Sequence, residues 1–106
     1  DVHCFNVSQL KLDFDNPSSP VVASEFVGTS ITSQARPQER MNRVLPDNPH
    51  ILLGDSRYRG YTRVDLTPRL WTASLRVMET VQKRDAPCST LATYVVEDGK
   101  PGPLKA

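Results

Sequence analysis

The sequence has little material for a large hydrophobic core. Only 38% of its 106 residues are hydrophobic, and one tryptophan, three tyrosines and three phenylalanines stand against nine prolines. A chain of this length is long enough for one small domain, but so few apolar side chains leave little with which to close a core. We therefore expect that the chain does not fold alone.

An excess of charge of one sign and long apolar runs are also absent. Thirteen basic and twelve acidic residues give a formal charge of +1, so no strong field favours nucleic acid or a membrane surface. The apolar run at residues 51–53 is far shorter than the roughly 20 residues of a membrane-spanning helix. The first residues also lack the pattern of an export signal. We expect no nucleic-acid partner, no transmembrane segment and, if the protein is exported, a signal in upstream sequence.

Cysteine is scarce as well. The chain has two, Cys4 and Cys88, which is enough for one disulfide bridge. They can pair with each other, pair with another chain or stay free. The sequence favours none of these three states.

What the sequence does contain is the alternation of apolar and polar residues that is typical of strands. Residues 5–14 alternate with one change of phase between Val7 and Leu10, which predicts a strand with a bulge. Thr67-Pro68-Arg69 is a natural turn between two alternating segments and predicts a hairpin. The other predicted strands are 21–27, 51–53, 61–66, 71–78 and 90–96.

The remaining segments are rich in turn-forming residues. Residues 28–49 have loop composition, with a helical turn expected around 38–43. Asp98-Gly99, followed by prolines, predicts the end of ordered structure and a frayed tail over 100–106. A mainly β chain with long loops has many unpaired strand edges, and we expect something outside this chain to cover them.

Two residues at the start of the chain are candidate metal ligands. In Asp1-Val2-His3 a carboxylate and an imidazole lie two residues apart, and on an extended chain both would point to the same side. This pair of donors suits zinc, iron or manganese, whereas calcium would use the carboxylate alone. Without further context, a solvated terminus with an incidental histidine is the more frequent explanation of such a triplet.

Three further residues are candidates for supporting roles. Glu25 lies in a predicted strand, and Thr29 lies in the Gly-Thr-Ser turn that ends it. Hydroxyl groups in such a turn can brace a metal ligand or merely cap the backbone. His50 leads into an apolar strand, where a structural histidine is more common than a ligand. We keep all three as groups near a metal or substrate.

Two other features have a functional and a structural explanation. The run Arg57 to Tyr61 mixes cations with aromatic rings, as a surface for phosphate or for a partner chain would, although exposed loop arginines are more common. Trp71 on its alternating strand is expected to belong to the core.

Taken together and in order, these segments resemble the C-terminal region of the PhoD-type alkaline phosphatases. This family belongs to the calcineurin-like metallophosphoesterases and also includes related phospholipases D. The resemblance runs almost end to end. The tracts that carry it are 1–3, 19–33, 47–50, 59–61, 67–68 with 71–73, and 93–99.

The resemblance implies the fold. The whole protein would be an α/β metallophosphoesterase sandwich, and this chain its predominantly β C-terminal fragment. Within the chain, residues 1–33 would form the strand and loop of the metal motif, 34–49 a loop, 50–99 the β-rich C-terminal part and 100–106 the tail. The tract after Ser33 reads Gln34-Ala35-Arg36-Pro37 where many relatives carry a pair of glycines, so the resemblance says less about substrate class than about reaction.

The resemblance also implies a cofactor and a partner. Asp1 and His3 would be the remains of a Gly-Asp-x-His motif that binds a di-metal centre, which contains iron and calcium in similar family members; zinc and manganese also suit the donors. The other ligands would come from upstream sequence. We expect this upstream part to be a larger chain that binds this one tightly, or else to be preceding sequence of the same polypeptide.

The implied function is hydrolysis of phosphate esters, monoesters or diesters, by a metal-activated water, in a secreted or periplasmic protein. A phospholipase D that acts on phospholipid headgroups with the same site is an alternative. A non-enzymatic β-rich interaction module is an alternative of another class, and it predicts no bound metal. Glu25 and Thr29 would support the metal ligands, and His50 would orient a ligand or the leaving group.

Overall fold

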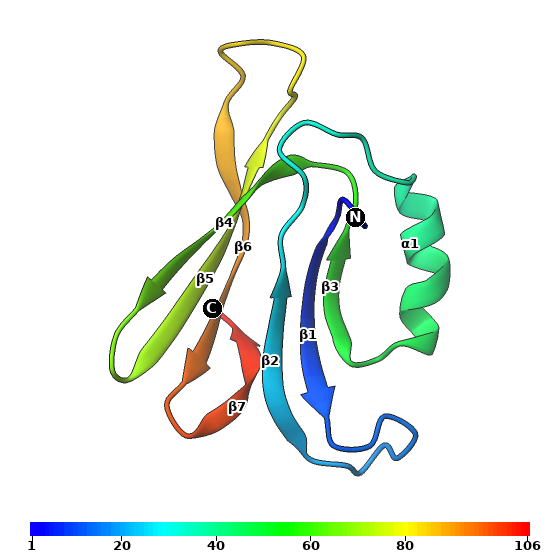
Figure 1. The fold of residues 1–106 in the computed structure, drawn as a ribbon, viewed down its shortest axis with the longest axis vertical. Helices are drawn as coiled ribbons and strands as arrows, with labels where there is room; N and C mark the ends of the chain where they lie inside the picture. Colours follow the sequence, from blue (N-terminus) through cyan, green and yellow to red (C-terminus); the bar gives the residue numbers. More distant parts are fainter.

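The computed structural model describes residues 1–106 and consists of two antiparallel sheets and one short helix (Figure 1). The first sheet has the strand order β2-β1-β3 and the second the order β4-β5-β6-β7. A single turn of 3-10 helix, Leu45–Asp47, follows the α-helix. The other elements are β1 (Phe5–Lys11), β2 (Val21–Val27), α1 (Gln38–Val44), β3 (Ile51–Asp55), β4 (Arg59–Leu66), β5 (Leu70–Met78), β6 (Cys88–Glu97) and β7 (Lys100–Lys105).

The bulge predicted in the first strand is confirmed, but the strand is shorter than predicted. Pairing of β1 with β3 shifts register between Val7 and Ser8. The strand ends at Lys11 instead of reaching residue 14. The backbone N–H of Asp13 donates to Ser19 Oγ at 2.8 Å, and that of Asp15 to the Asp13 carboxylate at 2.9 Å. These side-chain hydrogen bonds offer the backbone turns in place of a sheet ladder.

Helix α1 confirms the helical turn expected around residues 38–43 and lies along β3 (Figure 1). Its first residue ties it to the end of that strand. Gln38 Nε2 donates to the Gly54 carbonyl at 3.1 Å, and Gln38 Oε1 accepts from the Ser56 backbone N–H at 2.8 Å. The structure contains no helix that is long and apolar enough to span a bilayer.

The predicted hairpin forms one side of the second sheet, with β4 at its edge. Strands β4 and β5 pair from Arg59 with Met78 to Leu66 with Trp71. At the turn, Thr67 Oγ1 accepts from the Leu70 backbone N–H at 3.0 Å. The Trp71 ring packs 5.1 Å from that of Phe26 on the first sheet. It is only partly buried and lies outside the buried core, contrary to the prediction.

The C-terminal tail is not frayed, contrary to the prediction. Asp98-Gly99 is the turn of a second hairpin, with Gly99 at a φ of 71°, and it returns the chain as β7 beside β6. Gly102 and Pro103 are buried, and the Gly102 N–H donates to Ser24 Oγ on β2 at 2.9 Å. The prolines mark turn chemistry in the sequence, but an edge strand tolerates them because one of its sides needs no N–H donors.

One core joins the two sheets. It contains six buried apolar residues, of which Phe5 and Val7 come from β1 and the others from β5 and β6. Phe5, Val7 and Leu75 have no solvent exposure. Because β1 contributes directly, the start of the chain is anchored to the core immediately after His3. The remaining members are Val77, Ala92 and Tyr94.

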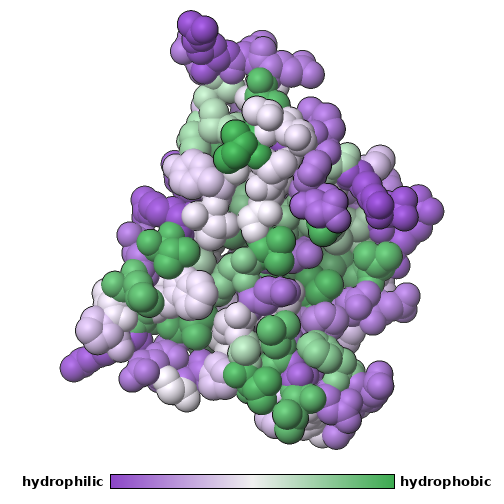
Figure 2. Space-filling model, viewed as in Figure 1, coloured by the Kyte–Doolittle hydropathy of each residue, from purple (hydrophilic) through white to green (hydrophobic).

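The chain exposes more surface than a closed domain of its size. Its accessible surface is 7096 Å² and its radius of gyration 14.6 Å, whereas a compact monomer of this mass would show about 5,900 Å² and about 13 Å. Apolar side chains reach the surface in several places in Figure 2. Val64 and Leu66, which alternation assigns to the buried face of β4, are 48% and 75% exposed.

Candidate functional site

Asp1 and His3 lie immediately before β1 and line one cavity of about 470 Å³ together with Val2, Gln34, Ala35 and Arg36. The prediction that an extended chain brings them to one side is wrong in its geometry. His3 has a φ of 58°, in the left-handed region, which histidine enters more readily than most residues. The pair shares the cavity because the backbone turns at His3.

The hydrogen bond of the His3 ring determines its tautomer. Nδ1 lies 2.9 Å from the carbonyl oxygen of Gln34. Since a carbonyl oxygen can only accept, Nδ1 carries the proton and donates it. In the neutral ring this leaves the lone pair on Nε2 free for a metal ion, and a backbone carbonyl is a common orienting partner of histidine ligands.

Thr29 lies beside His3, as a supporting residue would. Its hydroxyl oxygen is 3.2 Å from the His3 carbonyl oxygen and 3.0 Å from that of Tyr58. The single hydroxyl proton is shared between the two acceptors. Thr29 therefore ties the turn at His3 to the segment that enters β4.

Thr29→Val is expected to lower the stability of the complete protein by about 1 to 2 kcal/mol, because two carbonyl groups lose their hydroxyl donor. For a protein of this class each kcal/mol shifts the melting temperature by about 2–4 °C, which thermal unfolding will show. Thr29→Ser keeps the hydroxyl and serves as the control. A serine variant that melts as low as the valine variant would show that the methyl group matters instead.

Glu25 and His50 are not brought to this cavity. Glu25 is exposed on β2 opposite Ser8. His50 precedes β3, where its carbonyl accepts from Gln9 N–H at 2.8 Å and its ring meets that of Phe14 edge-on at 4.9 Å. Gln9 is six residues beyond His3, about 20 Å along an extended strand. Their supporting roles stay predictions, and the ring contact of His50 has the character of structural packing.

Two groups near His3 were missed in the sequence. Gln34 acts through its backbone carbonyl, which no side-chain motif can reveal. Arg59 belongs to the run at residues 57–61, in which arginines were expected to be exposed, but it is only 5% exposed. Its strand neighbours Tyr61 and Arg63 on the same face are exposed, so alternation misplaces Arg59. Residues 30–33 cover it.

The cysteines do not bridge. Cys4 is buried and Cys88 exposed, and both are free. Burial raises the pKa of the Cys4 thiol, and the positive charge of Arg59 offsets part of that rise. Burial therefore favours the protonated thiol of Cys4 rather than the thiolate that binds metals.

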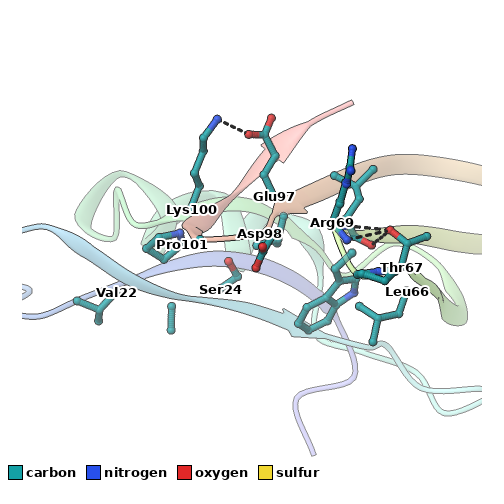
Figure 3. Close-up of a pocket in the computed structure, with 15 residues that line it drawn as sticks. Val22, Ser24, Leu66, Thr67, Arg69, Glu97, Asp98, Lys100 and Pro101 are labelled. Carbon is teal, nitrogen blue, oxygen red and sulfur yellow. Dashed lines mark hydrogen bonds and ion pairs between the residues drawn. The ribbon is translucent and has the colours of Figure 1, made fainter.

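The largest cavity of the chain lies elsewhere. It measures about 650 Å³ and opens between β2 and the turns of the two hairpins (Figure 3). The exposed ion pair between Lys100 and Glu97 lies on its rim, at 2.5 Å. None of the five candidate residues lines it, so we place the site at the smaller cavity, where the donor groups are.

Comparisons with known proteins show which family this chain resembles. A family model described as PhoD-like phosphatase matches residues 1–75, which include Asp1, His3, Thr29 and Arg59. The chain belongs to the PhoD-like phosphatase family. Alkaline phosphatase D of Bacillus subtilis (strain 168) is 40% identical over 105 residues, which are 96% of this chain and 18% of that protein.

A solved structure of PhoD gives the same picture in three dimensions. It matches all of this chain with a TM-score of 0.84 and 37% sequence identity, and the chain covers 21% of it. The chain thus spans about a fifth of the length of the PhoD proteins that it matches. As predicted, it is a predominantly β fragment of a larger PhoD fold.

The donors of this PhoD-like chain fit a share of a metal centre. His3 presents Nε2 because Nδ1 is engaged, and the Asp1 carboxylate is exposed and belongs to none of the three ion pairs of the structure. No group of three or more histidine, cysteine, aspartate or glutamate side chains gathers in the chain. Two protein ligands are fewer than a catalytic metal site normally has, so further donors are needed.

Proposed function

We propose that this chain is the C-terminal part of a metal-dependent phosphoesterase that hydrolyses phosphate esters, with Asp1 and His3 as ligands of a di-metal centre. The observation that carries the proposal is the orientation of His3 beside Asp1. The Gln34 carbonyl engages Nδ1 at 2.9 Å, in a region that the PhoD-like phosphatase model matches. Iron and calcium are the proposed metals; imidazole with carboxylate suits zinc or manganese as well.

Such a metal pair, when bound, lowers the pKa of a coordinated water and stabilises the charge of the phosphoryl group. The residues of this chain would hold the metal ions in position. Asp1 would neutralise part of the cationic charge, and His3 would donate Nε2 in a fixed orientation. Thr29 holds the His3 carbonyl, and the exposed guanidinium of Arg36 lines the same cavity, where a cation favours an anionic ester.

We further propose that the upstream part of the protein covers this chain and completes the centre. Three observations support this: the accessible surface exceeds that of a closed domain by roughly a fifth, Val64 and Leu66 face solvent, and only two donors lie at the cavity. An exported protein, secreted or periplasmic, is the proposed setting.

The complete protein is expected to contain bound metal and to lose turnover when a chelator removes it. Native mass spectrometry with elemental analysis would show two or more metal ions per complex. Hydrolysis of a phosphate monoester, a phosphodiester and phosphatidylcholine vesicles would be measured before chelation, after it, and after iron and calcium are returned. Restoration of turnover supports the proposal, and the substrate that is hydrolysed fastest identifies the ester class.

Two results would contradict it. Full hydrolysis by metal-free protein would remove the metal from the reaction. A folded, metal-free monomer of 11.8 kDa would show that the chain needs no upstream part, and would favour the interaction module.

A further inference from the structure

Arg59 is a buried cation that has no carboxylate partner. The three ion pairs of the structure join Arg57 with Asp55, Arg63 with Asp65, and Lys100 with Glu97. Arg59 is 5% exposed and belongs to none of them. Burial lowers the pKa of its guanidinium, although an arginine remains charged in proteins. A buried charge is costly unless its donors are satisfied, so the partners of Arg59 show what it holds.

Two of its three partners are oxygens of the loop that follows β2, and the third lies between β3 and β4. Arg59 Nη1 donates to Ser30 Oγ at 3.0 Å and to the Ser33 carbonyl at 2.6 Å. Nη2 donates to the Ser56 carbonyl at 2.7 Å. The Ser30 hydroxyl in turn donates to the Ser33 carbonyl, and the Gly60 N–H donates to the Ser30 carbonyl at 3.2 Å. One guanidinium thus closes the turn at residues 30–33 and joins it to the entry of β4.

This turn leads directly to the oxygen that orients His3. Ser33 precedes Gln34, whose carbonyl accepts from His3 Nδ1 at 2.9 Å. Residues 31–34 are exposed, so burial does not hold this carbonyl in place. Its position depends on the hydrogen bonds of the turn, and Arg59 supplies two of them.

We propose that Arg59 is a positioning residue for His3. Through the turn at residues 30–33 it places the Gln34 carbonyl, which fixes the tautomer of the imidazole and keeps Nε2 available as a ligand. This inference rests on the proposed role of His3 in metal binding. Groups that orient a ligand typically contribute 10–100-fold to metal affinity.

A double-mutant cycle in the complete protein tests this. The readout is the chelator concentration at which half of the copurified metal is lost, measured by elemental analysis. Arg59→Lys keeps the charge but not the planar fork of donors, and is expected to lower this concentration about 10–100-fold. Arg63→Lys, an exposed arginine on the same strand, is the control and should leave it unchanged.

Coupling separates positioning from general support of the fold. In the His3→Ala background, Arg59→Lys is expected to have no further effect, because its influence passes through the missing imidazole. If Arg59→Lys does not fold, Ser30→Ala replaces it in the cycle. That variant removes one acceptor of the guanidinium and is expected to lower retention in the same direction.

The outcomes distinguish the two proposals. If His3→Ala retains metal like the unmodified protein, the proposed role of His3 fails and the inference fails with it. If His3→Ala loses metal but the Arg59 variant retains it, or if the two effects multiply independently, only the positioning role is overturned.

Discussion

Gly60→Ala is expected to prevent stable folding of the complete protein, or to lower its stability by about 3 kcal/mol or more. A Cβ atom at residue 60 would lie 1.9 Å from the carbonyl oxygen of Arg76 and 2.9 Å from its carbonyl carbon. These are backbone atoms of the central strand β5, paired over its whole length. They cannot turn away as a side chain can, so β4 would have to separate from β5.

The consequence extends to the site, because Gly60 follows Arg59 and its N–H donates to Ser30. The expected result is a low yield of soluble protein and a melting temperature lowered by about 6 °C or more, seen in thermal unfolding. Gly28→Ala is the matched control, since its Cβ would meet only Thr62 Oγ1 at 3.8 Å. Equal melting of the two variants would refute the close approach of β4 to β5.

Removal of residues 100–106 is expected to have an effect of similar size. The deletion takes away β7, with the buried Pro103 and with hydrogen bonds such as that from Gly102 N–H to Ser24 Oγ. At about 1 kcal/mol for each lost hydrogen bond, the cost is about 3 kcal/mol or more. It also exposes the edge of β6 to other chains.

Thermal unfolding and light scattering of the complete protein with a stop after Gly99 would show this loss of stability and the resulting aggregation. A stop after Ala106, which keeps all of β7 and the hydrogen bond from the Ala106 N–H to the Thr93 carbonyl, is the control. If the shorter protein melts like the control and stays monomeric, the tail would be dispensable, as expected for a frayed end.

Local patterns in the sequence were sufficient for most of the strands. Alternation located β4 and β5 to within a few residues, and the turn at residues 67–69 predicted the hairpin between them. Such patterns work because side chains on a strand alternate between two faces. The change of phase after Val7 likewise predicted the bulge.

The same patterns failed where a distant segment supplied the environment. The tail is ordered because β7 pairs with β6 and bonds to β2, a partner 78 residues away from Gly102. Arg59 is buried because residues 30–33 fold over a strand face that is otherwise exposed. The alternation of apolar and polar residues distinguishes the two faces of a strand, but it does not indicate which distant segment covers either face.

For the candidate site, the sequence was sufficient to name Asp1 and His3, because carboxylate and imidazole are donors that bind metals. Its resemblance to the PhoD family was also visible in the sequence. The turn at His3, the partner of its ring and the burial of Arg59 depended on contacts between residues 26 to 31 positions apart. Chemistry is carried by the residue type. The orientation of the His3 ring depends on backbone carbonyl groups. Because every residue has one, only the packed fold determines which of them faces the imidazole.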